Sequence, residues 1–291
     1  MSNICTIAGQ LPFWIQVTRI DRPAGWLVLM WPTWIALILA GHQYGGFDFK
    51  IWAIFTLGVI LTRSAGCVVN DLTDAKFDRH VKRTKTRPIT AGSLTRKDAA
   101  FIALTLLLTA FGLVIMTNKT TIILSCIALG LIIVYPWLKR ITFWPQIGLG
   151  AAFSMAIPMA FSAYEQPINK VVLVLFIGNV SWTLAYDTFY AMVDRDDDIL
   201  IGIKSTAIAF GRFDLIAIGI CQAAALAAFS YAFWLSELNP LSLFGLGGAL
   251  GFAIHHQIIA RTRERDACFK AFLQNHRFGA ALFMGTVLGV L

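Results

Sequence analysis

The chain contains nine runs of mainly apolar residues, each long enough to cross the ~30 Å hydrocarbon core of a bilayer as an α-helix. They cover residues 24–41, 51–69, 99–117, 120–138, 144–163, 170–192, 214–235, 240–259 and 271–291. The last is the least regular, because Arg277 interrupts it. Only 14% of the residues are charged, against about 25% in an average soluble domain, which excludes an ordinary water-soluble globule. The sequence therefore predicts an all-α integral membrane protein with nine transmembrane helices, forming a single domain over residues 1–291.

Basic residues indicate how the helices are oriented. If the N-terminus is cytoplasmic, every Lys and Arg lies in a cytoplasmic segment except Lys50, Lys119, Lys170 and the intramembrane Arg63. Such a bias follows the positive-inside rule and predicts that the N-terminus and the longer charged loops face the cytoplasm. The same rule accounts for much of the net charge of +8, so we do not expect a nucleic-acid partner.

Half of the acidic residues, eight of 16, lie in two short segments, 70–78 and 187–198. Four predicted spans separate these segments, so both reach the same face of the membrane. At 100° per residue, each segment gathers its polar side chains on one helical face. The first face carries Asn70, Asp71, Asp74 and Asp78, and the second carries Asp187, Asp194 and Asp198. Asp197 lies to the side of the second face, and Asp196 points the opposite way.

Two facing arrays of carboxylates would repel each other and destabilise the bundle unless a cation lay between them. Mg²⁺ suits such a site, because this hard ion binds oxygen ligands and is commonly shared between protein carboxylates and substrate phosphates. Any one of these residues taken alone could instead belong to a solvated helix end. The regular pairing of the two arrays at one membrane surface favours a metal site formed by both faces.

Basic side chains that could complete a diphosphate site lie close to the acidic segments. Arg83 and Arg87, within VKRTKTRPITAG (81–92), offer forked donors that match phosphate oxygens, and Lys85 adds a point charge. Lys139 and Lys204 could likewise contribute positive charge to the diphosphate site. The alternative is that these residues only fix the orientation of the helices in the membrane.

Arg63 lies well inside the predicted span 51–69. It lies seven residues before Asn70, on the same helical face and about 10 Å deeper in the membrane. The side chain could extend toward the headgroups. Otherwise an intramembrane charge indicates an anionic partner, such as the carboxylate of a small substrate.

Four motifs stand out along the chain: RIDRPAGWLVLMWP (19–32), the NDxxDxxxD element at 70–78 with RPITAG after it, YPWLKR (135–140) and YDTFYAMVDRDDDILIGIKST (186–206). Together they resemble the motifs of the UbiA-type intramembrane aromatic prenyltransferases. The resemblance extends over essentially the whole chain, and within the family it is greatest to members that prenylate 4-hydroxybenzoate in ubiquinone biosynthesis. It implies nine helices around a central cavity and Mg²⁺ held by both acidic segments.

The resemblance also implies an activity and residue roles. A polyprenyl group would pass from polyprenyl diphosphate to C3 of 4-hydroxybenzoate in the bacterial inner membrane. Asn70, Asp74, Asp78, Asp194 and Asp198 would act at the diphosphate.

The resemblance places Arg63 near the aromatic acid. We assign to Asp194, at the inner end of the second acidic face, the removal of a proton from the phenol or from the substituted ring. Two alternatives remain: a family member with another acceptor, such as haem, homogentisate or dihydroxynaphthoate, and a secondary transporter of an organic anion.

Overall fold

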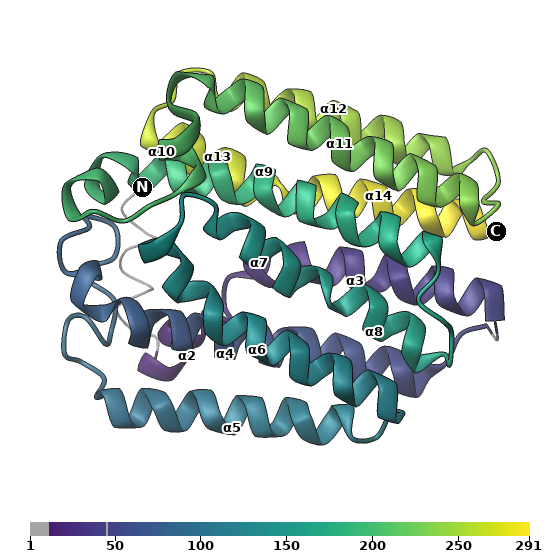
Figure 1. Ribbon diagram of the computed structural model, residues 1–291, viewed down its shortest axis with the longest axis horizontal. Helices are drawn as coiled ribbons and strands as arrows, with labels where there is room; N and C mark the ends of the chain where they lie inside the picture. Colours follow the sequence, from purple (N-terminus) through teal and green to yellow (C-terminus); the bar gives the residue numbers. More distant parts are fainter. Residues whose placement is uncertain (1–11, 45) are drawn as a thin grey trace.

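The computed structural model describes residues 12–44 and 46–291. Within these ranges the chain forms α-helices that lie side by side in one bundle, and it contains no strand (Figure 1). Eight spans in the described residues are long and apolar enough to cross a membrane. They are α3 (Pro23–Tyr44), α4 (Phe49–Asp78), α5 (Arg96–Val114), α6 (Lys119–Ile141), α7 (Pro145–Ser154) together with α8 (Ala156–Ala163), α9 (Lys170–Ile201), α10 (Thr206–Phe210) together with α11 (Asp214–Leu235), and α12 (Ser242–Ala260). The ninth expected span is divided between α13 (Arg265–Gln274) and α14 (His276–Val290), which confirms the predicted nine-helix membrane bundle.

Two of the spans contain breaks that the apolar runs did not predict. The run at 144–163 is interrupted between α7 and α8 at Met155. Pro158 explains this break, because a proline clashes with the carbonyl four residues earlier, which here belongs to Ser154. The run at 271–291 is divided at Asn275, whose side-chain amide donates to the carbonyl of Ala271 at 2.8 Å.

The helices α4 and α9 are much longer than a membrane span requires. They contain 30 and 32 residues, so each is at least about 45 Å long, against a hydrocarbon core of about 30 Å. Both end on the same side of the bundle, on the left in Figure 1, where α10 and the start of α13 also lie. The acidic segments are therefore helical continuations of two spans, which keeps their side chains in fixed directions.

Glycines allow the last helices to pack closely. A Cβ atom on Gly245 of α12 would lie 2.3 Å from the Cα atom of Gly285 of α14, so neither helix could carry a side chain there. Similarly, a Cβ atom on Gly279 would meet the ring of Trp182 at 2.4 Å. Small residues at such contacts let helix backbones approach within a membrane, where the hydrophobic effect does not drive helix association.

Outside the acidic faces, Asp214 at the start of α11 is a fully buried carboxylate. It accepts a hydrogen bond from Arg195 of α9 and another from Arg263, after α12, at 3.0 Å. These two ion pairs join α9, the start of α11 and the segment after α12 at one end of the bundle.

Asp214→Ala is expected to destabilise the protein by about 2–3 kcal/mol, because it leaves two guanidinium groups without their buried partner. The partial exposure of Arg195 and Arg263 keeps the loss below that of a fully buried pair. Thermal unfolding in detergent measures the effect. Asp21→Ala is the control, since Asp21 and Arg22 form an exposed pair 4.0 Å apart, and an equal loss of stability in both variants would contradict the prediction.

Candidate active site

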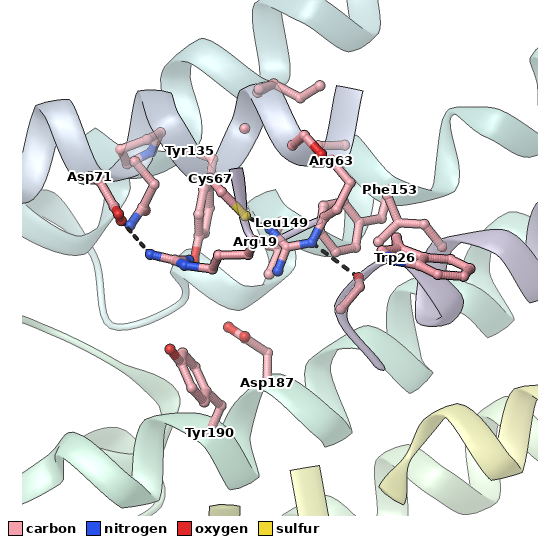
Figure 2. A pocket seen from close by; sticks show the side chains of 18 of the residues that line it. Arg19, Trp26, Arg63, Cys67, Asp71, Tyr135, Leu149, Phe153, Asp187 and Tyr190 are labelled. Atoms are coloured by element: carbon pink, nitrogen blue, oxygen red, sulfur yellow. Dashed lines mark hydrogen bonds and ion pairs between the residues drawn. The ribbon is translucent and has the colours of Figure 1, made fainter. Parts of the chain in front are cut away.

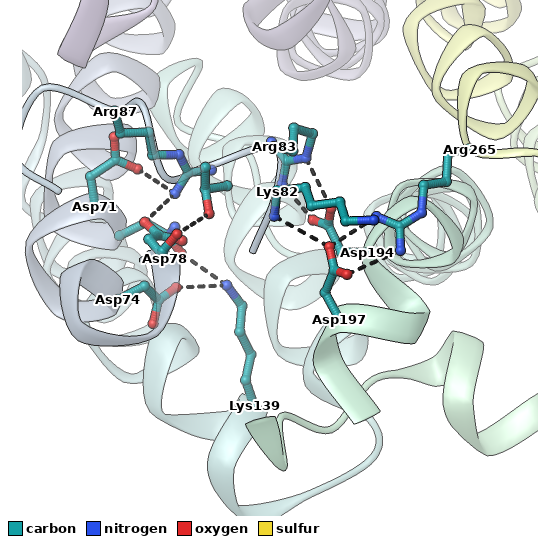
Figure 3. Close-up of polar contacts among 12 residues, drawn as sticks. Asp71, Asp74, Asp78, Lys82, Arg83, Arg87, Lys139, Asp194, Asp197 and Arg265 are labelled. Carbon is teal, nitrogen blue, oxygen red and sulfur yellow. Dashed lines mark hydrogen bonds and ion pairs between the residues drawn. The ribbon is translucent and has the colours of Figure 1, made fainter. Parts of the chain in front are cut away.

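A cavity of about 1150 Å³ lies between α4 and α9 and includes the acidic end of both helices. Its wall contains every residue of the two predicted acidic faces, namely Asn70, Asp71, Asp74, Asp78, Asp187, Asp194 and Asp198. Asp196 does not line the cavity, and its side chain is 79% exposed. The directions expected from helical periodicity are thus confirmed, and the two faces lie across the cavity from each other (Figure 3).

Basic side chains already neutralise the carboxylates of α4. Arg87 bridges two of them, with its Nη1 atom 2.9 Å from Asp71 Oδ1 and 2.7 Å from Asp78 Oδ2. The ammonium of Lys139, from the end of α6, donates to Asn70 Oδ1 at 3.1 Å and to Asp74 Oδ2 at 3.0 Å. A cation therefore occupies a position between two oxygen donors of this face.

On the opposite wall, the loop between α4 and α5 binds the acidic face of α9. Arg83 forms a two-pronged contact with Asp194, from Nε to Oδ1 at 3.1 Å and from Nη2 to Oδ2. The same guanidinium lies 4.5 Å from the centre of the Tyr190 ring. Burial opposes the charge of Arg83, but Tyr190 and Asp194 raise the pKa of this guanidinium above its ordinary value, so it stays protonated.

Two other basic residues predicted at the diphosphate occupy different environments. Lys204 lines the cavity, and its ammonium donates to the carbonyl of Ile141 at 3.0 Å. Lys85 is exposed and does not line the cavity, so the structure does not bring it to the acidic faces. Its loop has no periodicity from which the direction of a side chain could be predicted.

Arg63 lies deeper in the same cavity, and its hydrogen bonds are with groups other than carboxylates. Its Nε atom donates to the carbonyl of Gly25 at 3.0 Å, and its Nη1 atom donates to Cys67 Sγ at 2.9 Å. The ring of Phe153 lies 6.0 Å away. Figure 2 shows Asp187 on the far side of the cavity. Within the described residues Arg63 forms no ion pair, unlike Arg83, Arg87 and Lys139, so its charge is available to an anionic ligand.

Residues 29–283 match the model of the UbiA prenyltransferase family. The chain belongs to this family. Its curated UbiA relatives include the 4-hydroxybenzoate octaprenyltransferase of Tolumonas auensis, which is 48% identical over 95% of this chain and 96% of that protein. Another is the 4-hydroxybenzoate octaprenyltransferase of Sodalis glossinidius, 46% identical over 96% of this chain and 95% of that protein.

Solved structures of UbiA homologues have the same fold. The apo structure of a homologue from Aeropyrum pernix K1 has a TM-score of 0.80 at 21% identity and covers 91% of this chain and 98% of that one. A homologue from Archaeoglobus fulgidus, bound to GPP and Mg²⁺, has a TM-score of 0.70 at 16% identity, over 95% of this chain and all of that one. At these identities the likeness establishes the fold.

Arg19 lines the UbiA cavity but was given no role by the sequence argument. It follows the short helix α2 (Phe13–Thr18), adopts a left-handed backbone conformation (φ 52°), and pairs with the buried Asp71. Burial opposes its charge, yet Asp71 raises the pKa of this guanidinium. Its place in the RIDRP motif was the available signal, but the pairing could not be predicted because Asp71 lies 52 positions further along the chain.

The oxygen atoms of the two acidic faces fit a magnesium ion that is shared with a diphosphate. In the part of the chain that the structure describes, no three Asp, Glu, His or Cys side chains converge closely enough to hold a metal by themselves. The position of the Lys139 ammonium shows, however, that Asn70 and Asp74 can direct two oxygens at one cation. Mg²⁺ commonly takes one or two protein carboxylates and completes its shell with water and phosphate oxygens.

Proposed function

We propose that this UbiA protein transfers a polyprenyl group from polyprenyl diphosphate to C3 of 4-hydroxybenzoate, a step of ubiquinone biosynthesis, with Mg²⁺ as cofactor. The names of its curated relatives, which match nearly its whole length, support this substrate pair. The observation that carries the proposal is the unpaired Arg63, set deeper in the same cavity as the acidic and basic groups. A diphosphate site and a carboxylate site in one cavity favour a transferase over an organic-anion transporter.

The diphosphate would lie between the two acidic faces. Asn70, Asp74, Asp78, Asp194 and Asp198 would hold Mg²⁺ there together with the diphosphate. The bound metal would supply positive charge that stabilises the departing diphosphate.

Among the basic groups of the cavity, Arg83, Arg87 and Lys139 would exchange their carboxylate partners for phosphate oxygens. Asp71 is almost fully buried and paired with both Arg19 and Arg87, so we assign it the role of positioning these two arginines. Lys204 would contribute charge at the rim.

The aromatic acid would bind with its carboxylate on Arg63 and its ring beside Phe153 and Trp26, which lie next to Arg63 in Figure 2. The forked guanidinium matches a carboxylate in shape and charge. This orientation directs the phenol end of the ring away from Arg63, toward the diphosphate end of the cavity.

The reaction breaks the bond between the allylic carbon and the diphosphate oxygen, and the diphosphate leaves with the electron pair. C3 of the ring forms a bond to the allylic carbon, and the proton on C3 passes to a carboxylate. We assign this proton to Asp194, which would lose its contact with Arg83 when Arg83 turns to the diphosphate. The apolar part of the cavity wall excludes water that would otherwise react with the allylic cation.

We place the protein in the bacterial inner membrane, with its N-terminus and the acidic end of the cavity in the cytoplasm. The support is the distribution of Lys and Arg, which favours the ends of α4 and α9 over the opposite ends of the spans.

Membranes that contain the protein are expected to convert 4-hydroxybenzoate and octaprenyl diphosphate to the 3-octaprenyl acid. EDTA should abolish the conversion and added Mg²⁺ should restore it, because the acidic residues bind the diphosphate only through a cation. Chromatography with mass detection measures the product. An absence of product with Mg²⁺ present, or full activity in EDTA, would contradict the proposal.

A further inference from the structure

Asp187 differs from most carboxylates of the two acidic faces in having no cationic partner. Four of the others form ion pairs with arginine or lysine, namely Asp71, Asp74, Asp78 and Asp194. Within the described part of the chain Asp187 forms no ion pair, although it is only 8% exposed. Asp198 is also unpaired, but it is partly exposed and lies about 16 Å nearer the end of α9. A buried carboxylate without a cation is costly, so Asp187 indicates a ligand that the cavity is built to receive.

Gln146, near the start of α7, holds Asp187 in a fixed direction. Its Oε1 atom accepts a hydrogen bond from the backbone N–H of Thr206 at 3.1 Å. This contact fixes which end of the side-chain amide carries the donors, and that end donates to Asp187. Gln146 and Asp187 both line the cavity. Because an ionised carboxylate accepts several hydrogen bonds, Asp187 is held in place and can still accept one from a ligand.

Arg63 on α4 is the counterpart of Asp187 on α9. Arg63 lies seven residues before Asn70, and Asp187 lies seven residues before Asp194, so each is about 10 Å deeper than its acidic end. Figure 2 shows the two side chains on opposite sides of the cavity. Lys139 and Arg63 both attract Asp187, but neither forms an ion pair with it. The deep part of the cavity therefore has an unpaired cation on one wall and an unpaired anion on the other.

We propose that Asp187 accepts a hydrogen bond from the phenol hydroxyl of the aromatic acceptor and thereby selects acids with a hydroxyl opposite the carboxylate. This inference rests on the proposed function. The two unpaired groups suit a ligand with an anion at one end and a hydrogen-bond donor at the other. 4-Hydroxybenzoate is rigid and has these groups at opposite ends of its ring. With its carboxylate on Arg63, the ring crosses the cavity and its hydroxyl reaches the α9 wall.

This contact also affects the reactivity of the ring. A hydrogen bond from a phenol to an anion is stronger than one to a neutral group, and it increases the electron density on the phenol oxygen. That density is shared with the ring carbons next to the hydroxyl, which include C3. We therefore assign Asp187 to the acceptor, whereas Asp194 and Asp198 are left for the diphosphate and its metal.

Equilibrium binding of 4-hydroxybenzoate and benzoate to the purified protein tests the proposal. The wild-type protein should bind 4-hydroxybenzoate on the order of 10- to 100-fold more tightly than benzoate, as expected for a hydrogen bond to a charged group. 4-Methoxybenzoate, which keeps the oxygen but cannot donate, should bind no better than benzoate. Equal affinity of the wild-type protein for all three acids would overturn the proposal without any variant.

Asp187→Leu is expected to bind 4-hydroxybenzoate and benzoate about equally, because leucine has the branched shape of aspartate but cannot accept a hydrogen bond. Asp198→Leu is the matched control, since it removes the same charge from the same wall about 16 Å away. It should keep the wild-type ratio of the two affinities. A wild-type ratio in Asp187→Leu, or an equal fall of the ratio in both variants, would overturn the role of Asp187.

The binding readout separates this inference from the proposed function, because it needs no prenyl transfer. A hydroxyl preference that depends on Asp187, in a protein that never prenylates 4-hydroxybenzoate, would refute the proposed function and leave the phenol site in place. Prenylation of 4-hydroxybenzoate by a protein that binds benzoate equally well would refute the phenol site and leave the proposed function in place.

Discussion

Asp198→Ala is expected to lower kcat for prenyl transfer by about 10²- to 10³-fold, the usual effect of removing a group that stabilises charge in a transition state. Asp198 faces the cavity from α9, opposite the carboxylates of α4. Without it, the proposed Mg²⁺ site would lose an oxygen donor on that wall. Single-turnover assays with saturating substrates and Mg²⁺ measure the chemical step directly.

Asp196→Ala is the matched control for this experiment. It removes the same group from the same helix two residues away, but Asp196 points out of the cavity and is 79% exposed. Its activity should stay near that of the wild type. Equal losses in the two variants would mean that the total negative charge of the segment matters, and not the face that points into the cavity.

Arg63→Gln is expected to raise KM for 4-hydroxybenzoate by about 10- to 100-fold, because a hydrogen bond to a charged group contributes about 1.5–3 kcal/mol. KM for the polyprenyl diphosphate should change little, since Arg63 forms no ion pair with the acidic and basic groups that we propose to bind the diphosphate. Initial rates measured while each substrate is varied in turn separate the two constants.

A neutral acceptor provides the control for the Arg63 prediction. The wild-type protein should use 4-hydroxybenzamide much less well than 4-hydroxybenzoate, whereas Arg63→Gln should use the two acceptors about equally. If the variant still preferred the acid by the wild-type factor, another residue would bind the carboxylate.

Helical periodicity explains the features that were predicted correctly from the sequence. The spans, the directions of Asp194 and Asp198, and the outward direction of Asp196 all follow from local geometry, because a residue's place on a helix depends only on its distance along the chain. The family also followed from local motifs. The division of the fifth span could have been found from the same kind of signal, since Pro158 stands within its apolar run.

The charge pairing of the site could not be predicted in this way. Arg83 and Asp194 are 111 residues apart, and the loop that carries Arg83 has no regular repeat that fixes the direction of its side chains. For the same reason the sequence grouped the exposed Lys85 with Arg83 and Arg87. The sequence also predicted Mg²⁺ as the cation between the carboxylates, and the structure adds arginine and lysine side chains that pair with them.

These ion pairs have a consequence for turnover. In the proposed reaction, Arg83, Arg87 and Lys139 would exchange their carboxylate partners for phosphate oxygens when a diphosphate enters, so the free energy gained would be only the difference between two similar attractions. When pyrophosphate departs, each of these cations would return to its former carboxylate and would not remain unpaired in a poorly solvated pocket. An enzyme arranged in this way can hold a highly charged product weakly enough to release it and begin the next cycle.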